Sequence, residues 1–250
     1  MPGFLRLTAT NDTGSVKRGK KRSQHTNTML NIRNKKELDK KLRDVHLYCF
    51  TPGSFLRGRD PLAVSAAQIK GGADVIQLRE KDMAKKDILD LGLKLRQITR
   101  QKGVLFIVND DIEIALKTDA DGVHLGQDDT PISIARPVMK EKLIGISTHS
   151  VEQAIEAINS GADYIGVGPV FKSTTKDEYE PVGIDLLLKI RDISPIPYVA
   201  IGGISLNNIE QLTKAHCHSA AVISDIMNAA DITKRCRELK HALVKKQKHC

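Results

Sequence analysis

The sequence contains no tryptophan among its 250 residues, and aromatic residues make up only 4% of it. Such a chain has few rings on which exposed bases could stack, which argues against a platform for single-stranded nucleic acid. No uncharged apolar run approaches the roughly 18 residues that a membrane-spanning helix needs. The four cysteines are far apart and include no C-x-x-C pair. We therefore expect a protein of the reducing cytoplasm, without a disulfide framework.

Positive charge is plentiful, with a formal net charge of +9, but it is unevenly distributed along the chain. Residues 1–45 hold 12 basic and 4 acidic residues, which leaves 27 basic and 26 acidic residues for the rest. The part expected to fold is therefore nearly neutral. A nucleic-acid-binding function would need a basic stripe on that part, so we expect no nucleic-acid partner, and no membrane partner either.

Residues 1–34 form a basic leader with a single acidic residue, Asp12, and a basic run from Lys17 to Arg22. No apolar segment follows these charges, so the leader lacks the pattern of a secretory signal peptide. A disordered tail is the favoured interpretation. Import into an organelle and a true start at Met29 are the alternatives. We place a domain boundary after residue 34 and assign 35–250 to one folded domain.

From His46 onward, short aliphatic runs alternate with longer amphipathic segments. Runs without polar alternation are typical of strands buried on both faces. The predicted strands are 46–50, 75–78, 104–108, 122–125, 143–146, 164–167, 198–201 and 220–223. The predicted helices are 35–45, 61–71, 85–101, 111–118, 131–140, 150–160, 184–192, 206–215 and 228–245.

Eight strands, each followed by a helix, in about 200 residues predict an α/β fold of the (β/α)8 TIM-barrel class. The alternative is an open, doubly wound sheet. That fold usually has fewer strands and an early glycine-rich turn between a strand and a helix, and this turn is missing here. The barrel is therefore favoured.

Polar residues collect directly after the predicted strands, at the end of a barrel where active sites lie. Arg79, Lys81 and Lys176 provide fixed positive charge there. Neutral hydrogen-bonding side chains accompany them: Asn109, Ser147, Ser173, Thr174 and Thr175. This combination suits an anion with many oxygens, such as a diphosphate. Surface ion pairing would explain any one of the charges alone, but their convergence favours an anion site.

Asp110 and Asp129 end neighbouring predicted strands, which lie about 5 Å apart in a sheet. Two carboxylates that close repel each other unless a proton or a cation lies between them. Mg²⁺ is commonly held by one or two carboxylates together with substrate phosphates. Asp129 is also well placed to cap the helix that follows Thr130-Pro131, and Asp110 or Asp111 is well placed to cap the helix after the preceding strand. The spacing alone leaves the metal site and the helix caps as equal interpretations.

A second phosphate site is indicated at the ends of the last two predicted strands. Gly202-Gly203 and Ile223-Ser224 lie where these strands end and precede helices, so backbone N–H groups at a helix start would face an anion. Two phosphate sites across one barrel mouth imply a reaction that joins or splits two phosphorylated molecules.

These residues belong to longer motifs. The motifs are Gln77-Leu78-Arg79-Glu80-Lys81, Asn109-Asp110, residues 121–129, Gly145-Ile146-Ser147, residues 166–171 with Thr174-Thr175-Lys176, and residues 200–204. Together they resemble the thiamine phosphate synthase (thiamine-phosphate pyrophosphorylase) family over about residues 46–243. The resemblance implies a (β/α)8 transferase that couples hydroxymethylpyrimidine diphosphate to hydroxyethylthiazole phosphate, giving thiamine phosphate and pyrophosphate. These two substrates are the expected partners, and a homo-oligomer is an open alternative to a monomer.

The resemblance also implies roles for individual residues. Gln77 would face the pyrimidine, and Asp110 and Asp129 would bind Mg²⁺ as the cofactor. The diphosphate would be held by Arg79, Lys81, Asn109, Ser147 and Lys176, with Ser173 and Thr175 lining the same mouth. The thiazole phosphate would be held by Gly203, Ile223 and Ser224. The expected catalytic groups are Arg79, Lys81, Ser147 and Lys176, because the protein must stabilise charge on departing pyrophosphate and needs no nucleophilic side chain.

The sequence departs from the family pattern in three places. Ser173 stands where the family commonly has Thr, which keeps the hydroxyl. Asp225 follows Ser224 where Ala is usual, and this places a negative charge beside the expected thiazole-phosphate site. His216-Cys217-His218 replace a turn of small residues, but adjacent residues do not readily ligate one metal ion.

Two other functions remain open. One is a proton-transfer isomerase of similar sequence that aromatises a thiazole tautomer, for which His149 would be the general base. The other is a barrel that binds a phosphorylated ligand without catalysis. The complete set of anion-binding and carboxylate residues favours the synthase over both.

Overall fold

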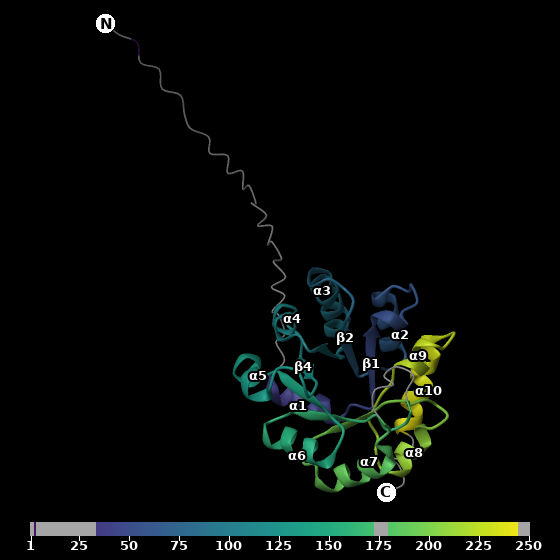
Figure 1. Ribbon diagram of the computed structural model, residues 1–250. Helices are drawn as coiled ribbons and strands as arrows, with labels where there is room; N and C mark the ends of the chain where they lie inside the picture. Colours follow the sequence, from purple (N-terminus) through teal and green to yellow (C-terminus); the bar gives the residue numbers. More distant parts are fainter. Residues whose placement is uncertain (1–2, 4–33, 173–179, 245–250) are drawn as a thin grey trace. The chain divides into compact units, whose positions relative to one another are not determined.

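The computed structural model describes Gly3 and residues 34–172 and 180–244, which contain a closed parallel β-barrel surrounded by helices (Figure 1). The strands are hydrogen-bonded in sequence order from β1 to β8, and β8 pairs with β1. The predicted (β/α)8 class is confirmed, and the open sheet is excluded. The predicted leader, residues 1–34, lies outside the described residues except for Gly3 and Asn34.

The strands are β1 (Leu47–Pro52), β2 (Val75–Arg79), β3 (Leu105–Asn109), β4 (Gly122–Leu125), β5 (Leu143–Thr148), β6 (Tyr164–Val167), β7 (Tyr198–Ile201) and β8 (Ala220–Ala221). The helices are α1 (Lys35–Arg43), α2 (Pro61–Lys70), α3 (Lys85–Lys102), α4 (Ile112–Lys117), α5 (Ile132–Met139), α6 (Val151–Asn159), α7 (Gly183–Ile193), α8 (Ile209–Lys214), α9 (Ser224–Met227) and α10 (Ile232–Val244), with a 3-10 turn, η1, at Gly53–Phe55.

Each predicted strand is present, and each predicted helix overlaps an observed one. Two elements were not predicted, the short helices η1 and α9. The helix expected at 228–245 begins later, as α10, where Asp231 accepts a hydrogen bond from the backbone N–H of Lys234 at 2.9 Å. Strand β8 covers two residues instead of the four expected.

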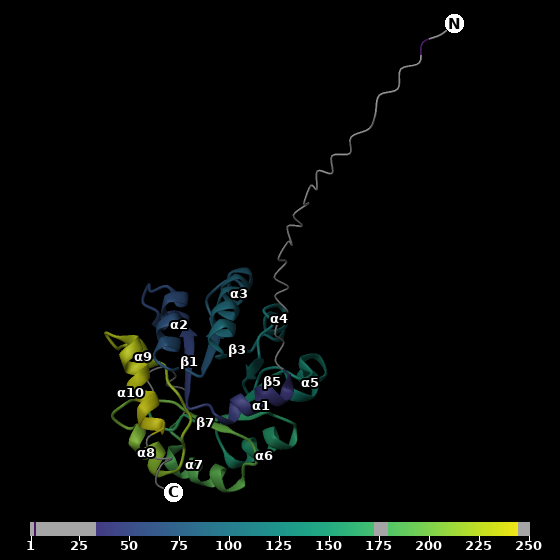
Figure 2. The ribbon, with the colours of Figure 1, turned by 180° about the vertical axis from the view of Figure 1, so that it is seen from behind.

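Apolar side chains fill the barrel, and helix α1 covers the end where the strands begin. Leu38 and Leu42 of α1 are buried in one cluster with Val75, Leu105 and Leu143, which are the first residues of their strands. The view from behind shows α1 beside the strands (Figure 2). This closure leaves the opposite, carboxyl end of the strands as the accessible mouth of the barrel.

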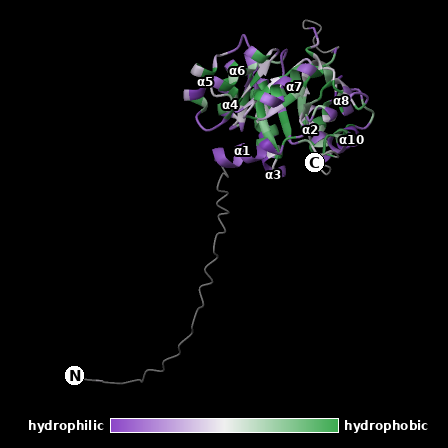
Figure 3. Cartoon of the chain, turned by 90° about the horizontal axis from the view of Figure 1, so that it is seen from below, coloured by the Kyte–Doolittle hydropathy of each residue, from purple (hydrophilic) through white to green (hydrophobic). Residues whose placement is uncertain are grey.

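A second, larger cluster lies between the outer side of the strands and the helices. It contains alternate strand residues such as Ile76 and Leu78, packed with buried residues of the helices such as Leu95 of α3 and Leu239 of α10. Figure 3 shows hydrophobic strands inside helices whose outer sides are mostly hydrophilic. Both faces of the sheet are buried, which is why the strand sequences lack polar alternation.

Aspartates in the turns before β2, β4 and β6 tie the strands together at the amino-terminal end. Asp74 accepts hydrogen bonds from the backbone N–H groups of His46 and Leu47, at 2.8 and 2.9 Å. Asp121 accepts one from Phe106 at 2.9 Å, and Asp163 accepts one from Ile144 at 2.7 Å. Each of these aspartates links the turn before one strand to the backbone of the strand before it, so the turns on this face stabilise the barrel.

Within the described ranges, no helix combines the length and the apolar composition needed to cross a membrane. Cys49, Cys217 and Cys236 are buried free thiols, and Cys250 lies outside the described residues.

Candidate active site

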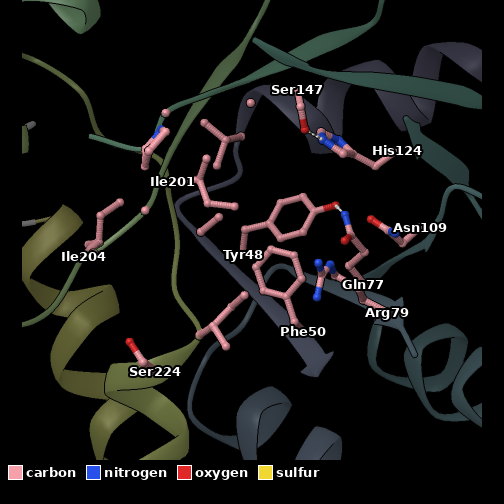
Figure 4. Close-up of a pocket in the computed structure, with 18 of the residues that line it drawn as sticks. Tyr48, Phe50, Gln77, Arg79, Asn109, His124, Ser147, Ile201, Ile204 and Ser224 are labelled. Atoms are coloured by element: carbon pink, nitrogen blue, oxygen red, sulfur yellow. Dashed lines mark hydrogen bonds between the residues drawn. The ribbon is translucent and has the colours of Figure 1, made fainter. Parts of the chain in front are cut away.

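A pocket opens at the carboxyl end of the barrel and receives residues from every strand or from the loop that follows it. Tyr48, Tyr164 and Val199 form its apolar depth. Figure 4 shows the polar side chains of Gln77, Arg79, Asn109, His124 and Ser147 on one side and Ser224 with Ile204 on the other. The rings of Tyr48 and Phe50 lie between these two sides.

The structure brings together most of the residues predicted for substrate binding. Those that line the pocket are Gln77, Arg79, Asn109, Ser147, Gly203, Ile223 and Ser224. Lys81, Asp110 and Asp129 do not line the pocket but form a charged group with Arg79, described below. Ser173, Thr174, Thr175 and Lys176 lie outside the described residues, so their predicted roles stay predictions.

A chain of hydrogen bonds crosses the polar wall of the pocket. Gln77 Nε2 donates to the hydroxyl of Tyr48 at 2.8 Å, and the Tyr48 hydroxyl lies 3.1 Å from that of Tyr164. The Tyr164 hydroxyl lies 3.1 Å from His124 Nδ1, and His124 Nε2 lies 3.0 Å from Ser147 Oγ. Burial raises the pKa of both tyrosines well above the usual value, so they remain neutral hydroxyls.

The distances are compatible with one direction through the whole chain. If Tyr48, which accepts from Gln77, donates to Tyr164 and Tyr164 donates to His124 Nδ1, a neutral His124 carries its proton on Nε2 and donates it to Ser147 Oγ. In that tautomer the hydroxyl proton of Ser147 points away from His124 and is available to an anion in the pocket.

Sequence reasoning missed Tyr48, Tyr164 and His124 as part of the site. The two tyrosines stand inside aliphatic strand runs, where a side chain is typically part of the core. Glycine at position 145 was the available signal, because a Cβ there would clash with the Tyr164 ring and lie 2.5 Å from His124 Nδ1. The strand has glycine where these two side chains meet.

The charged group contains two acidic and two basic side chains. Partial desolvation and a hydrogen bond with Asp129 raise the pKa of Asp110 to about 6, against the opposing effect of Lys81 and Arg79. The two carboxylates therefore face each other at the end of β3 and β4, as the strand spacing predicted. Asp129 also accepts a hydrogen bond from the backbone N–H of Gly126 at 2.6 Å, which fixes its position.

Of the helix caps expected here, the one at Asp111 is confirmed, and those at Asp110 and Asp129 are wrong. Helix α4 is capped by Asp111, which accepts a hydrogen bond from the backbone N–H of Ile114 at 2.8 Å. At α5 the N-cap residue is Pro131, and no side chain caps that helix. Neither Asp110 nor Asp129 is therefore needed for a helix start.

Glycines shape the opposite side of the pocket. Gly202 and Gly203 have φ angles of +97° and +62°, in the left-handed region that favours glycine. A Cβ on Gly203 would lie 2.8 Å from the carbonyl oxygen of Phe171 and would clash with it. Asn208 supports this loop, because its Nδ2 donates to the Gly203 carbonyl at 2.8 Å. The loop after β7 therefore holds its backbone close to the pocket.

The structure also places His149, the expected general base of the isomerase alternative, and the turn at residues 216–218. His149 lines the pocket, and its Nδ1 contacts the carbonyl oxygen of Gly168. In the His216–His218 turn, Cys217 Sγ donates to the carbonyl of Ser219 at 3.4 Å, and His218 Nδ1 lies 3.3 Å from the carbonyl of Leu243. Among the described residues, no three His, Cys, Asp or Glu side chains come together as a metal cluster.

Comparison with known proteins adds an independent result. Residues 47–226 match the family model for thiamine monophosphate synthase (TMP-TENI). A thiamine-phosphate synthase from Chloroflexus aurantiacus is 45% identical, over 79% of this chain and 92% of its own length. One from Halalkalibacterium halodurans is 43% identical, over 78% and 93%. The solved thiamine phosphate pyrophosphorylase from Pyrococcus furiosus matches with a TM-score of 0.76 and 36% identity, over 83% of this chain and 98% of that chain.

Proposed function

This chain belongs to the thiamine monophosphate synthase family, and we propose from this premise how its pocket divides between two substrates. The chain is a transferase of thiamine biosynthesis that couples hydroxymethylpyrimidine diphosphate to hydroxyethylthiazole phosphate. The synthase predicted from the sequence motifs is thereby confirmed over the isomerase and the non-catalytic barrel. The residues that perform each step, the metal ion and the location in the cytoplasm remain proposals.

The pyrimidine diphosphate belongs on the side of the pocket formed by β2 to β5. Gln77 is 2% exposed and lies at the depth of the tyrosines, where a planar polar ring fits. Arg79 and Asn109 stand at the ends of their strands, nearer the mouth. A diphosphate there would receive the hydrogen bond that Ser147 has available, together with the charges of Arg79 and Lys81. Lys176, Thr175 and Ser173 are proposed to complete this subsite from the loop after β6.

The donor set at Asp110 and Asp129 fits Mg²⁺. The two carboxylates face each other, and the pKa of Asp110 stays raised although Lys81 and Arg79 act to lower it. A divalent cation between the carboxylates would remove this repulsion. Hard oxygen ligands with positions left for diphosphate oxygens are the usual surroundings of Mg²⁺. When bound, Mg²⁺ would neutralise charge on the diphosphate and so make pyrophosphate a better leaving group.

The thiazole phosphate belongs on the side formed by β7 and β8. Gly203, Ile223 and Ser224 line the pocket there. Of these, Ser224 is seen on the side of the pocket opposite Arg79 and Asn109 (Figure 4). The glycine backbone offers N–H groups without a Cβ in the way, and Ser224 offers a hydroxyl. A single pocket contains both the polar side chains of β2 to β5 and the glycine loop and serine that follow β7 and β8, and this observation supports the placement of both substrates most directly.

The reaction follows from this division. The C–O bond of the pyrimidine diphosphate breaks, and its electron pair leaves with pyrophosphate. Arg79, Lys81, Lys176 and Ser147 stabilise the negative charge that develops there. The electron-rich aminopyrimidine stabilises the resulting carbocation, the apolar pocket excludes water, and the thiazole nitrogen uses its lone pair to form the new C–N bond. No side chain acts as a nucleophile.

The experiment incubates the purified chain with both substrates and Mg²⁺ and measures thiamine phosphate. The same assay then uses a pyrimidine diphosphate in which CF₃ replaces the ring methyl group. We expect turnover to fall by several orders of magnitude, because an electron-withdrawing group destabilises the cation. Competition against the normal substrate serves as the control and should show little change in affinity. Turnover of the CF₃ substrate at a near-normal rate would exclude ionisation in favour of direct displacement.

A further inference from the structure

A second cavity adjoins the thiazole side of the pocket and shares three residues with it, Gly203, Ile204 and Ser224. In the part of the chain that the structure describes, its charged lining residues are Lys172, Asp225 and Arg235. Asp225 is one of the three places at which the sequence departs from the pattern of the family that it resembles. Its carboxylate therefore stands one residue from a serine assigned to a phosphate.

The Asp225 carboxylate is held by contacts from two other segments. Its Oδ1 accepts a hydrogen bond from Arg235 Nη1 of α10 at 2.6 Å. Its Oδ2 accepts one from the backbone N–H of Leu206, in the loop after β7, at 3.4 Å. The side chains of Asp225 and Arg235 are 15% and 29% exposed, so solvent screens this pair only in part.

The contact with Arg235 offsets the negative charge of Asp225. An isolated carboxylate beside a bound phosphate would repel it, and like charges placed together in a binding site weaken binding strongly. Arg235 offsets the charge of Asp225, and its Nε also lies 3.5 Å from Oε2 of Glu238, which is 42% exposed and does not line the cavity. Among the charged residues described at this cavity, Lys172 is then the cation without an opposing charge. The charged residues that line the cavity therefore sum to one positive charge beside the proposed phosphate site.

We propose that Arg235 is a positioning and specificity residue of the thiazole-phosphate subsite, which it serves by neutralising Asp225. The proposal rests on the placement of the thiazole phosphate at Gly203 and Ser224. It assigns a role to a residue of α10, outside the strand ends that form the pocket. Its action is electrostatic, so removing the arginine and removing the aspartate must have opposite consequences.

The experiment compares Arg235→Met, Asp225→Asn and the double variant. Arg235→Met should raise the KM for the thiazole phosphate about tenfold or more, because it leaves the carboxylate uncompensated. The KM for the pyrimidine diphosphate should stay unchanged. Asp225→Asn should not raise the KM for the thiazole phosphate, and the double variant should restore a KM near that of the wild type. A purely structural pair gives the contrary pattern, in which both single variants weaken binding and the double variant rescues nothing.

Lys214→Met is the matched control, since it removes one positive charge from an exposed pair with Glu210 on α8. It should leave both KM values unchanged.

If Arg235→Met does not fold, the comparison uses Arg235→Lys and Asp225→Asn instead, and a raised KM for the thiazole phosphate in Asp225→Asn overturns the proposal. Ser224→Ala distinguishes an error in the assigned thiazole-phosphate subsite from an error in the role of Arg235. If it leaves that KM unchanged, the assigned subsite is wrong. If Ser224→Ala raises it and Arg235→Met does not, only the role of Arg235 is wrong.

Discussion

Asp110 adopts a left-handed backbone conformation, with φ of +61°. This region costs a non-glycine residue roughly 1–2 kcal/mol, although Asp tolerates it better than most residues. Its backbone N–H donates to the carbonyl of His124 at 2.9 Å, which holds the strained residue beside β4. Strain of this kind is concentrated at functional sites. The conformation supports a role for Asp110 that a helix cap does not require.

Asp129→Asn is the residue-scale test of the metal proposal. We expect kcat/KM to fall by about two orders of magnitude. A bound metal ion stabilises the negative charge of the transition state and so lowers the activation free energy by several kcal/mol. Half-saturation with Mg²⁺ should move to higher concentration, measured by titrating the ion in the thiamine phosphate assay. Asp111→Asn is the control, because it also removes a carboxylate but keeps an oxygen to cap α4. Full activity of Asp129→Asn at an unchanged Mg²⁺ requirement would contradict the metal site.

Residues at the mouth were predictable from the sequence because polar types follow apolar runs at the ends of the strands. Arg79, Asn109 and Ser147 were found in this way and line the pocket, whereas Gln77, which also lines it, was predicted from the family resemblance. Tyr48 and Tyr164 were not, because a hydroxyl inside an aliphatic strand gives no periodic signal. Only the three-dimensional meeting of β1, β4 and β6 shows that these hydroxyls form one chain.

At the scale of elements, strands were predicted more accurately than the helices after β8. Strands buried on both faces have continuous apolar sequences, so their ends are visible where polarity begins. The four-residue helix α9 is too short to show helical periodicity, and the following turn at Ala229–Asp231 is not marked by glycine or proline. The sequence pattern therefore left α9 unpredicted and started the last helix too early.

Arg96→Met is the element-scale prediction. Arg96 of α3 donates two hydrogen bonds to Asp121, at 2.9 and 3.1 Å, and both residues are buried. Asp121 also accepts the backbone N–H of Phe106, so it joins α3, β3 and the start of β4. Removing one partner of a buried pair leaves an uncompensated charge and should lower the free energy of unfolding by about 3–5 kcal/mol.

Urea denaturation followed by circular dichroism measures this loss. The control is Lys214→Met, whose pair with Glu210 is exposed and should contribute no more than about 1 kcal/mol. A loss for Arg96→Met as small as that of the control would show that the Arg96–Asp121 pair does not stabilise the barrel.

At the scale of the whole molecule, the boundary between the basic part of the chain and the nearly neutral part differs from the boundary of the packed domain. The excess of basic residues belongs to residues 1–45, but within that stretch helix α1 is part of the barrel. Leu38 and Leu42 are 2% and 4% exposed and close the end where the strands begin. The boundary that matters for stability therefore lies before α1.

Two shortened chains test this boundary. A chain that starts at Met29 keeps α1 together with Asn34, whose side chain accepts the backbone N–H of Glu37 at 2.9 Å. It should match the full chain in melting temperature and turnover, because residues 1–28 have no apolar periodicity with which to pack. A chain that starts at Val45 loses both leucines. Burial of two such side chains contributes about 3–6 kcal/mol, so this chain should melt at a markedly lower temperature. Equal melting of the two shortened chains would show that α1 does not close the barrel, and a loss already at Met29 would show that the leader contributes to the folded protein.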